Sequence, residues 1–545
     1  MLALSLTGLG CSGQISTSDQ VFSANNPNTT SPDSTSTADA AESASDGSPA
    51  GLRRLNNAEY NHTVRDLLGV ASTPAQAFIA DEKAAGFDNV AAVQGMTEAQ
   101  FQQYSAAAEA LAAKVFADPA LQSAVLGCEP ATGRTCGEAF IAGFVPQAYR
   151  RPITSAEAER LLRVYDQAIT LGESTTGALQ LTLHAILASP HFIYRVEDPS
   201  AADTADADAY ALASRLSYLL WSSMPDAELF ALAASGDLLT TETLEAQVER
   251  MLADPKSQRF VQNFAGQWLG LRDLTKHRSD VQIFPDYNQA LLEEMVAEGY
   301  AYFAEFLFQD RSLDTFFTAD LHFVGPELAA LYGFADVPAS ATQPVSDPSN
   351  TRRGFLGLAS FLTLSSFSYR TAPTLRGKWV LENLLCNPIP PPPTDVPQLD
   401  GENEELAELQ SQNIRERLAV HREQPQCAGC HNVLDPIGFG LEAFDAIGRH
   451  RTHYDNGDLI DSSGEFPDGS TFQGLEELST ILSHDERFTA CVSSKMLTYA
   501  LGRELTSADT PQLTAIRSSF SASGLHLRGL LQAIVQSPLF HGDAQ

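Results

Sequence analysis

The sequence predicts a mainly α-helical protein made of several helical domains, with a small β-ribbon in its C-terminal region. The chain has 545 residues, too many for one hydrophobic core, so three or more domains are expected. Apolar residues recur at helical spacing through most of the chain. Alternation of the strand type is rare outside residues 451–472.

The first fifty residues lack the features of a folded domain. Residues 1–11, "MLALSLTGLGC", look like the remnant of a bacterial lipoprotein signal in which Cys11 would be lipidated, although no basic residue precedes Arg53. Residues 12–50 are rich in Ser, Thr, Asp and Ala and hold too few large apolar groups to offset chain entropy. We therefore expect a disordered tether behind a lipid anchor. The alternative is a disordered N-terminus with an unrelated cysteine.

Two helical domains are expected next, over residues 51–120 and 121–200. In the first, Tyr60, Val64 and Leu68 recur at helical spacing and would share one buried face. Capping boxes predict two further helix starts. These pairs are Thr97 with Gln100 and Thr154 with Glu157.

A third helical domain is expected over residues 201–345. Its strongest signals are the long helical runs 207–221 and 291–308. Residues 346–400 are interpreted as a helix plus a polyproline spacer, because Pro390–Pro393 favours the stiff polyproline II conformation.

Residues 401–480 carry a cysteine motif followed by the β-ribbon. Two turn signals, Asn456-Gly457 and Asp468-Gly469, predict the hairpins of that ribbon. A C-terminal helical domain is expected over residues 481–545.

The pattern Ala-Ile-x-x-Ser-Pro-x-Phe occurs twice, at residues 185–192 and 533–540. Each copy should end a helix, because the residue before proline is driven out of the α region. Duplication of a helical module is the alternative explanation.

Composition excludes several classes of function. The net charge is −34, from 68 acidic and 34 basic residues, which argues against nucleic acid or an anionic membrane surface as a partner. The sequence contains no run of 18 apolar residues, so it predicts no transmembrane helix. The sequence lacks the G-x-S-x-G, H-E-x-x-H, Walker and G-x-G-x-x-G motifs, so a common hydrolase or nucleotide enzyme is not indicated.

Seven cysteines are present, of which Cys11 is the expected lipid site. Cys128 and Cys136 flank a turn-rich loop and suit a local disulfide in an oxidising compartment. Cys386 and Cys491 are then left as a second pair.

The remaining cysteines lie in "QPQCAGCHNVLDPIGFG", residues 424–440. Cys427, Cys430 and His431 form C-x-x-C-H, the attachment pattern of c-type haem. On a helical turn, residues i and i+3 point the same way, so both thiols could bond the two vinyl groups of one porphyrin. His431 would then be the proximal ligand of the haem iron.

Three other chemistries use a similar pair of cysteines. A zinc site needs a second ligand pair, and the sequence offers none near the motif. A thioredoxin-like dithiol needs a βαβ context, which the sequence around the motif does not predict. A Cys427–Cys430 disulfide is the strongest alternative. The motif predicts a C-terminal cytochrome c-like helical region, with one covalent haem c bound in residues 401–480. A carbonyl or carboxylate near Asp435-Pro436 could accept the free N–H of His431.

The distal side of the iron has several candidate ligands. Met496 falls on a helical face, where core packing is the favoured alternative. His421 is close to the motif in sequence, and His450 and His453 flank the first ribbon strand. No candidate dominates, which predicts an open or weakly held sixth position.

Long motifs carry a family resemblance across residues 51–545. In chain order they are "RRLNNAEYNHTVRDLLGV", "YRRPITSAEAERLL", "ASPHFIYRVE", "RLSYLLWSSMPDAELFALAASGDL", "RRGFLGLASFLTLSS", "RGKWVLENLL", "CAGCHNVLDPIGFGLEAFDAIGRHR" and "KMLTYALGREL". The chain resembles the secreted, planctomycete-type family built from domains of unknown function 1587, 1595, 1592, 1588 and 1585. This resemblance implies secretion and association with cytochrome c modules, and it implies no particular reaction.

Within the family motif "RGKWVLE" stand Arg376, Lys378, Trp379 and Glu382. They could start a helix with a buried tryptophan, or they could contact a substrate.

These observations predict an extracytoplasmic protein, periplasmic or on the outer surface, tethered to a membrane through lipidated Cys11. It would be a c-type haem protein acting in electron transfer with an extracytoplasmic redox partner. One alternative is a redox-silent envelope or polysaccharide-binding protein with a C-x-x-C disulfide. The other is a haem enzyme of the peroxidase or oxygenase kind.

Overall fold

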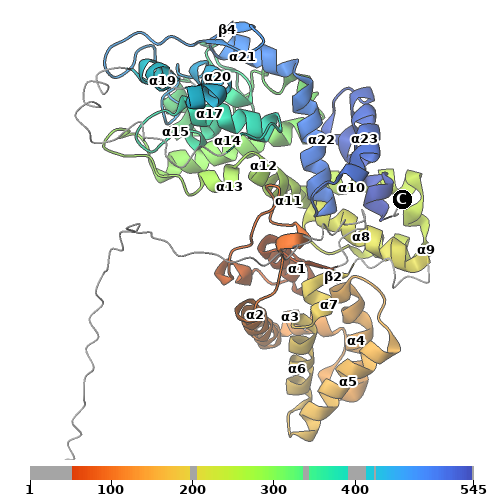
Figure 1. Ribbon diagram of the computed structural model, residues 1–545. Coiled ribbons are helices and arrows are strands. Elements are labelled where there is room, and N and C mark those ends of the chain that lie inside the picture. The colour runs from red at the N-terminus through yellow and green to blue at the C-terminus, as the bar shows by residue number, and fades with distance from the viewer. Residues whose placement is uncertain (1–51, 197–204, 336–342, 391–412, 423–424, 543–545) are drawn as a thin grey trace, which may run out of the picture. The chain divides into compact units, whose positions relative to one another are not determined.

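A computed structural model describes residues 52–196, 205–335, 343–390, 413–422 and 425–542. Within these ranges the protein is mainly helical, and two small antiparallel two-stranded sheets accompany the helices (Figure 1). The predicted fold class is therefore confirmed. Cys11, the tether and most of the polyproline run lie outside the described residues.

The first described segment is closed by a short sheet. Its strands pair antiparallel, with Leu52 opposite Val196 and Arg54 opposite Tyr194, so the segment begins and ends at the same place. Its elements are β1 (Leu52–Arg54), α1 (Asn57–Leu68), α2 (Glu98–Ala117), α3 (Pro119–Leu126), α4 (Arg134–Tyr149), α5 (Ser155–Thr170), α6 (Thr175–Leu187), α7 (Pro190–Ile193) and β2 (Tyr194–Val196).

Both predicted capping boxes are present in this segment. Thr97 accepts a hydrogen bond from the backbone of Gln100 at the start of α2, and Thr154 does the same for Glu157 at the start of α5. A third box, Asn56 with Glu59, begins α1. The Arg151 guanidinium and the cap backbone hold the pKa of Glu157 at about 2.

The middle segment contains the two long helices expected from the sequence. They are α8, at the predicted run 207–221, and α14, at the run 291–308. The helices of this segment are α8 (Ala205–Trp221), α9 (Ala227–Ser235), α10 (Thr241–Ala253), α11 (Gln258–Phe260), the π-helical η7 (Val261–Ala265), α12 (Gly266–Trp268), α13 (Leu271–Leu274), α14 (Gln289–Phe308) and α15 (Pro326–Tyr332).

The last segment combines helices with the predicted β-ribbon. Strands β3 and β4 pair with Gly464 opposite Phe472, and Gly469 has the positive φ of the expected turn. The elements are α16 (Ala359–Leu364), α17 (Pro373–Trp379), the π-helical η10 (Val380–Leu384), α19 (Ile414–Arg422), α20 (Pro425–Phe439), β3 (Ser463–Glu465), β4 (Thr471–Gln473), α21 (Gly474–Ser483), α22 (Glu486–Leu501), α23 (Thr510–Ala522), α24 (Leu527–Val535) and α25 (Pro538–His541).

The two Ser-Pro patterns adopt the same local structure. A helix ends just before each serine, and the serine then caps the one-turn helix α7 or α25. In both copies the final phenylalanine, Phe192 or Phe540, is fully buried. An arginine donates to the carbonyl of each, Arg150 at 3.0 Å and Arg215 at 3.0 Å.

Two large hydrophobic clusters organise the described chain. The N-terminal core consists of buried apolar residues between positions 55 and 193, together with Tyr218. The large core consists of Phe87, Val90 and buried apolar residues between positions 209 and 540. The large core includes residues of α8, α14, α20 and α22. In the part of the chain that the structure describes, every helix is too short or too polar to cross a bilayer.

Candidate functional site

Helix α20 carries the C-x-x-C-H motif in its first two turns. Pro425 begins the helix, a position where its missing N–H costs nothing. Cys427 is buried, with 7% of its surface exposed, and Cys430 is half-buried against the large core. Neither takes part in the two disulfides of the described chain.

The imidazole of His431 is oriented by a buried carboxylate one helical turn away. Its Nδ1 lies 3.0 and 3.1 Å from the two oxygens of Asp435. Asp435 has no exposed surface and also accepts a 2.7 Å hydrogen bond from the hydroxyl of Thr374. The expected carboxylate partner of His431 is thus present. It favours a proton on Nδ1 and leaves Nε2 as the nitrogen suited to bind a metal.

Two glycines let α17 and α20 cross in backbone contact. A Cβ atom on Gly377 would lie 1.9 Å from the carbonyl oxygen of Leu434, and one on Gly438 would lie 2.0 Å from that of Pro373. Any larger residue at either position would have to separate the helices. The crossing places Thr374 against Asp435, so it also sets the environment of His431.

Arg376 fixes the chain that follows α20. Its guanidinium is fully buried and donates to the carbonyls of Leu441, Phe444 and Asp445 at 2.7, 3.0 and 2.8 Å. Burial lowers the pKa of Arg376 to about 10, and buried Glu442, 3.4 Å away, opposes this. The side chain stays charged at neutral pH, and its contacts show a structural role.

The other residues of the "RGKWVLE" motif have packing and surface roles. The Trp379 ring packs on Phe361 and Phe355, with centroids 5.0 and 5.8 Å apart. Lys378 and Glu382 form a partly exposed pair at 3.8 Å. The motif therefore spans the end of α17 and the start of η10 rather than a helix start, and Trp379 is partly buried instead of fully buried.

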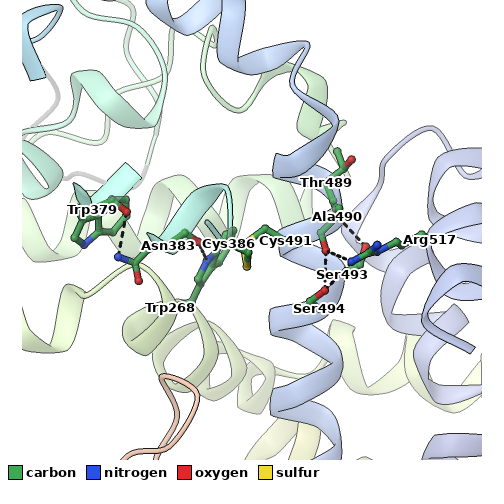
Figure 2. Close-up of a disulfide and its surroundings, with 10 residues drawn as sticks. All are labelled: Trp268, Trp379, Asn383, Cys386, Thr489, Ala490, Cys491, Ser493, Ser494 and Arg517. Atoms are coloured by element: carbon green, nitrogen blue, oxygen red, sulfur yellow. Dashed lines mark hydrogen bonds between the residues drawn. A yellow bond between two sulfur atoms is a disulfide. The ribbon is translucent and has the colours of Figure 1, made fainter. Parts of the chain in front are cut away.

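Both predicted disulfides, Cys128–Cys136 and Cys386–Cys491, are present. The second ties the end of η10 to α22 (Figure 2). Around it, the Trp268 indole donates to the carbonyl of Asn383 at 2.8 Å, and Arg517 donates to the carbonyl of Ala490 at 3.2 Å. The chain between the two cysteines includes α20.

The distal-ligand candidates differ in their surroundings. Met496 is fully buried in the large core, as the packing alternative expected. His450 packs edge-on against Phe444, with 5.6 Å between ring centroids, and His453 hydrogen-bonds Thr452. The side chain of His421 lies outside the described residues.

A cavity that no sequence motif indicates lies on another face of α20. It has a volume of about 750 Å³, and its lining includes Arg415, Arg422 and Phe439. Arg422 also lies 3.9 Å from Asp435, the partner of His431. The arginines of α19 gave no motif that could have indicated a site, because the cavity forms only when the ribbon folds back beside α19 and α20.

The residues at the motif are compatible with a covalently bound haem c. Two cysteines three apart and the following histidine share consecutive turns of one helix, and the histidine Nδ1 has a carboxylate partner. Within the described ranges, the motif included, no group of three or more His, Cys, Asp or Glu side chains is arranged to hold a metal ion by itself.

Fold and site together define a mainly helical, disulfide-bonded protein with a C-x-x-C-H helix held by a tight helix crossing. Five family models, each described as a protein of unknown function, match the chain in order. The matched residues are 53–117 (DUF1587), 136–197 (DUF1595), 207–334 (DUF1592), 352–454 (DUF1588) and 468–540 (DUF1585).

The chain therefore belongs to the multi-domain family built from these five domains. No curated protein and no solved structure matches it. Helices α17 and α20 and the residues that join them fall within the DUF1588 match.

Proposed function

We propose that the protein is an extracytoplasmic c-type haem protein that acts in electron transfer. Cys427 and Cys430 would hold the haem through thioether bonds, and His431 would bind its iron. The observation that carries the proposal is the His431–Asp435 pair, 3.0 Å apart in the same helix as the two cysteines. Bound haem would supply one-electron chemistry.

Asp435 has a defined part in this proposal. By accepting the Nδ1 proton it fixes the ring orientation and makes the imidazole a stronger donor to a metal. Thr374 and the Gly377 crossing hold the carboxylate in place, so the orientation of His431 depends on residues far away in sequence.

We further propose secretion, with Cys11 as a lipidated membrane tether and an extracytoplasmic redox protein as partner. Support comes from the signal-like residues 1–11 and from the two disulfides, which are typical of oxidising compartments.

The test is an optical spectrum of the protein produced in a host that matures c-type cytochromes. We expect a Soret band that persists after denaturation, because the haem would be covalent. Replacing both Cys427 and Cys430 by Ala should abolish it, whereas the matched Cys128→Ala/Cys136→Ala variant should keep it. A wild-type protein without bound haem would refute the proposal.

Addition of carbon monoxide to the ferrous protein then tests the sixth position. With Met496 buried in the large core, we expect a position open enough to bind carbon monoxide. A low-spin spectrum that carbon monoxide leaves unchanged, and that Met496→Ala alters, would show instead a methionine-ligated carrier. Turnover of peroxide would indicate the alternative haem enzyme.

A further inference from the structure

The cavity between α19, α20, the β3–β4 ribbon and α21 has none of the proposed haem-binding residues in its lining. Its volume is about 750 Å³. The residues used in the argument are Arg415, Arg422, Asn432, Phe439, Glu465 and Glu477, all of which line it.

Two guanidinium groups of this cavity share one aromatic ring. The guanidinium carbons of Arg415 and Arg422 lie 4.1 and 5.6 Å from the centre of the Phe439 ring. Two cations so close repel each other, although each also has a carboxylate within ion-pair distance. Arg415 is 3.5 Å from Asp461, and Arg422 is 3.9 Å from Asp435. An oxyanion in the cavity would neutralise both cations at once.

Charges of the opposite sign also line the cavity. Glu465 of β3 and Glu477 of α21 face it, and Glu465 is exposed. These carboxylates would repel an inorganic dianion but would accept hydrogen bonds from hydroxyl groups. Asn432 can donate and accept. The lining therefore suits a single negative charge joined to several hydroxyls.

We propose that this cavity binds a hydroxylated monocarboxylate of the size of one or two sugar units, such as a uronic acid. The carboxylate lies against Arg415 and Arg422, and the hydroxyls point toward Glu465, Glu477 and Asn432. A planar carboxylate matches the forked geometry of a guanidinium.

The ligand site and the haem motif use different faces of one helix. Successive residues of an α-helix are rotated by about 100°. Asn432 and Phe439 line the cavity, whereas Cys427, Cys430 and His431 are not among its lining residues. The inference consequently does not depend on the proposed haem.

Isothermal titration calorimetry of the full chain tests the proposal, with D-glucuronate as the probe. We expect saturable binding of glucuronate that is at least about tenfold tighter than that of glucose or sulfate, since only glucuronate has both the charge and the hydroxyls. Equal affinity for glucose would show that the arginines do not bind the carboxylate, and would contradict the proposal. Equal affinity for sulfate would reduce the cavity to a simple oxyanion site, and no binding of glucuronate would overturn the proposal.

Variants of α19 locate the binding. Arg422→Gln should weaken glucuronate binding by about tenfold or more, and Arg422→Lys by less, because it keeps the charge but loses the fork. Arg417→Gln is the matched control, since it removes the same charge from the same helix outside the cavity lining. Circular dichroism confirms that each variant folds. Equal weakening in the Arg417 and Arg422 variants would contradict the site.

Discussion

At Gly377, the size of one side chain decides how closely two helices approach. The carbonyl of Leu434 occupies the space where a Cβ atom would lie, and Gly438 meets the carbonyl of Pro373 in the same way. Next to this crossing, Arg376 is fully buried and bonded to three carbonyls of the chain after α20. These residues place Asp435 where it can pair with His431.

Gly377→Ala should therefore destabilise the protein, by about 1–3 kcal/mol, because the added methyl group forces α17 and α20 apart. Gly429→Ala is the matched control. Gly429 is an exposed residue of α20 whose Cβ would meet nothing within 4 Å, so alanine should be neutral or stabilising by up to about 1 kcal/mol. Urea unfolding of both variants measures the difference, and equal effects would contradict the close crossing.

The sequence predicted some of these residue contacts and missed others for a physical reason. His431 and Asp435 are four residues apart, a separation that one helix brings together, so the carboxylate partner could be anticipated. Gly377 and Leu434 are far apart in the chain, and nothing local indicates that their backbones touch. The pairing of Arg422 with Asp435 depends in the same way on how α19 packs.

Among whole elements, local signals gave the helix starts, the ribbon turns and the Cys128–Cys136 disulfide, whereas the Cys386–Cys491 disulfide followed only by elimination. Capping boxes depend on three or four consecutive residues, and the turn at Gly469 depends on two. The π-helical segment η10 was not anticipated. It ends at Leu384, two residues before Cys386, and the disulfide from Cys386 to α22 closes a loop that contains α20 and the ribbon.

Removal of the Cys386–Cys491 disulfide should cost more stability than removal of Cys128–Cys136. The first joins residues 105 apart and the second residues 8 apart. In the chain-entropy model, a loop of the larger size contributes about 4–5 kcal/mol and a loop of the smaller size about 2–3 kcal/mol. Guanidinium unfolding of the two double-alanine variants compares them. A larger loss for the short loop would show that local packing, rather than loop entropy, dominates.

For the molecule as a whole, the N-terminal core and the large core meet through buried polar groups. Arg259 of α11 binds both oxygens of Asp66 of α1, at 2.8 and 3.0 Å. Asp88 accepts hydrogen bonds from Asn56 and Arg272 at 2.9 and 2.7 Å. Such contacts hold the two cores in one arrangement, because separating them would leave buried charges without partners.

His62 of α1 lies at this junction and should make it sensitive to acid. Burial, with the nearby cations Arg259 and Arg65, lowers the pKa of His62 to about 4. The unfolded chain has an ordinary histidine pKa of about 6.5, so it binds the proton first.

The stabilisation from neutral His62 is therefore complete above about pH 6.5 and is lost as the pH falls toward 4, by up to about 3 kcal/mol. Replacing His62 by Gln should remove this part of the pH dependence. Urea unfolding of the wild type and the His62→Gln variant at pH 7 and pH 5 measures it. Because all other titrating groups are common to both proteins, the wild type should lose more stability than the variant between these pH values. Equal losses would show that folding does not lower the pKa of His62.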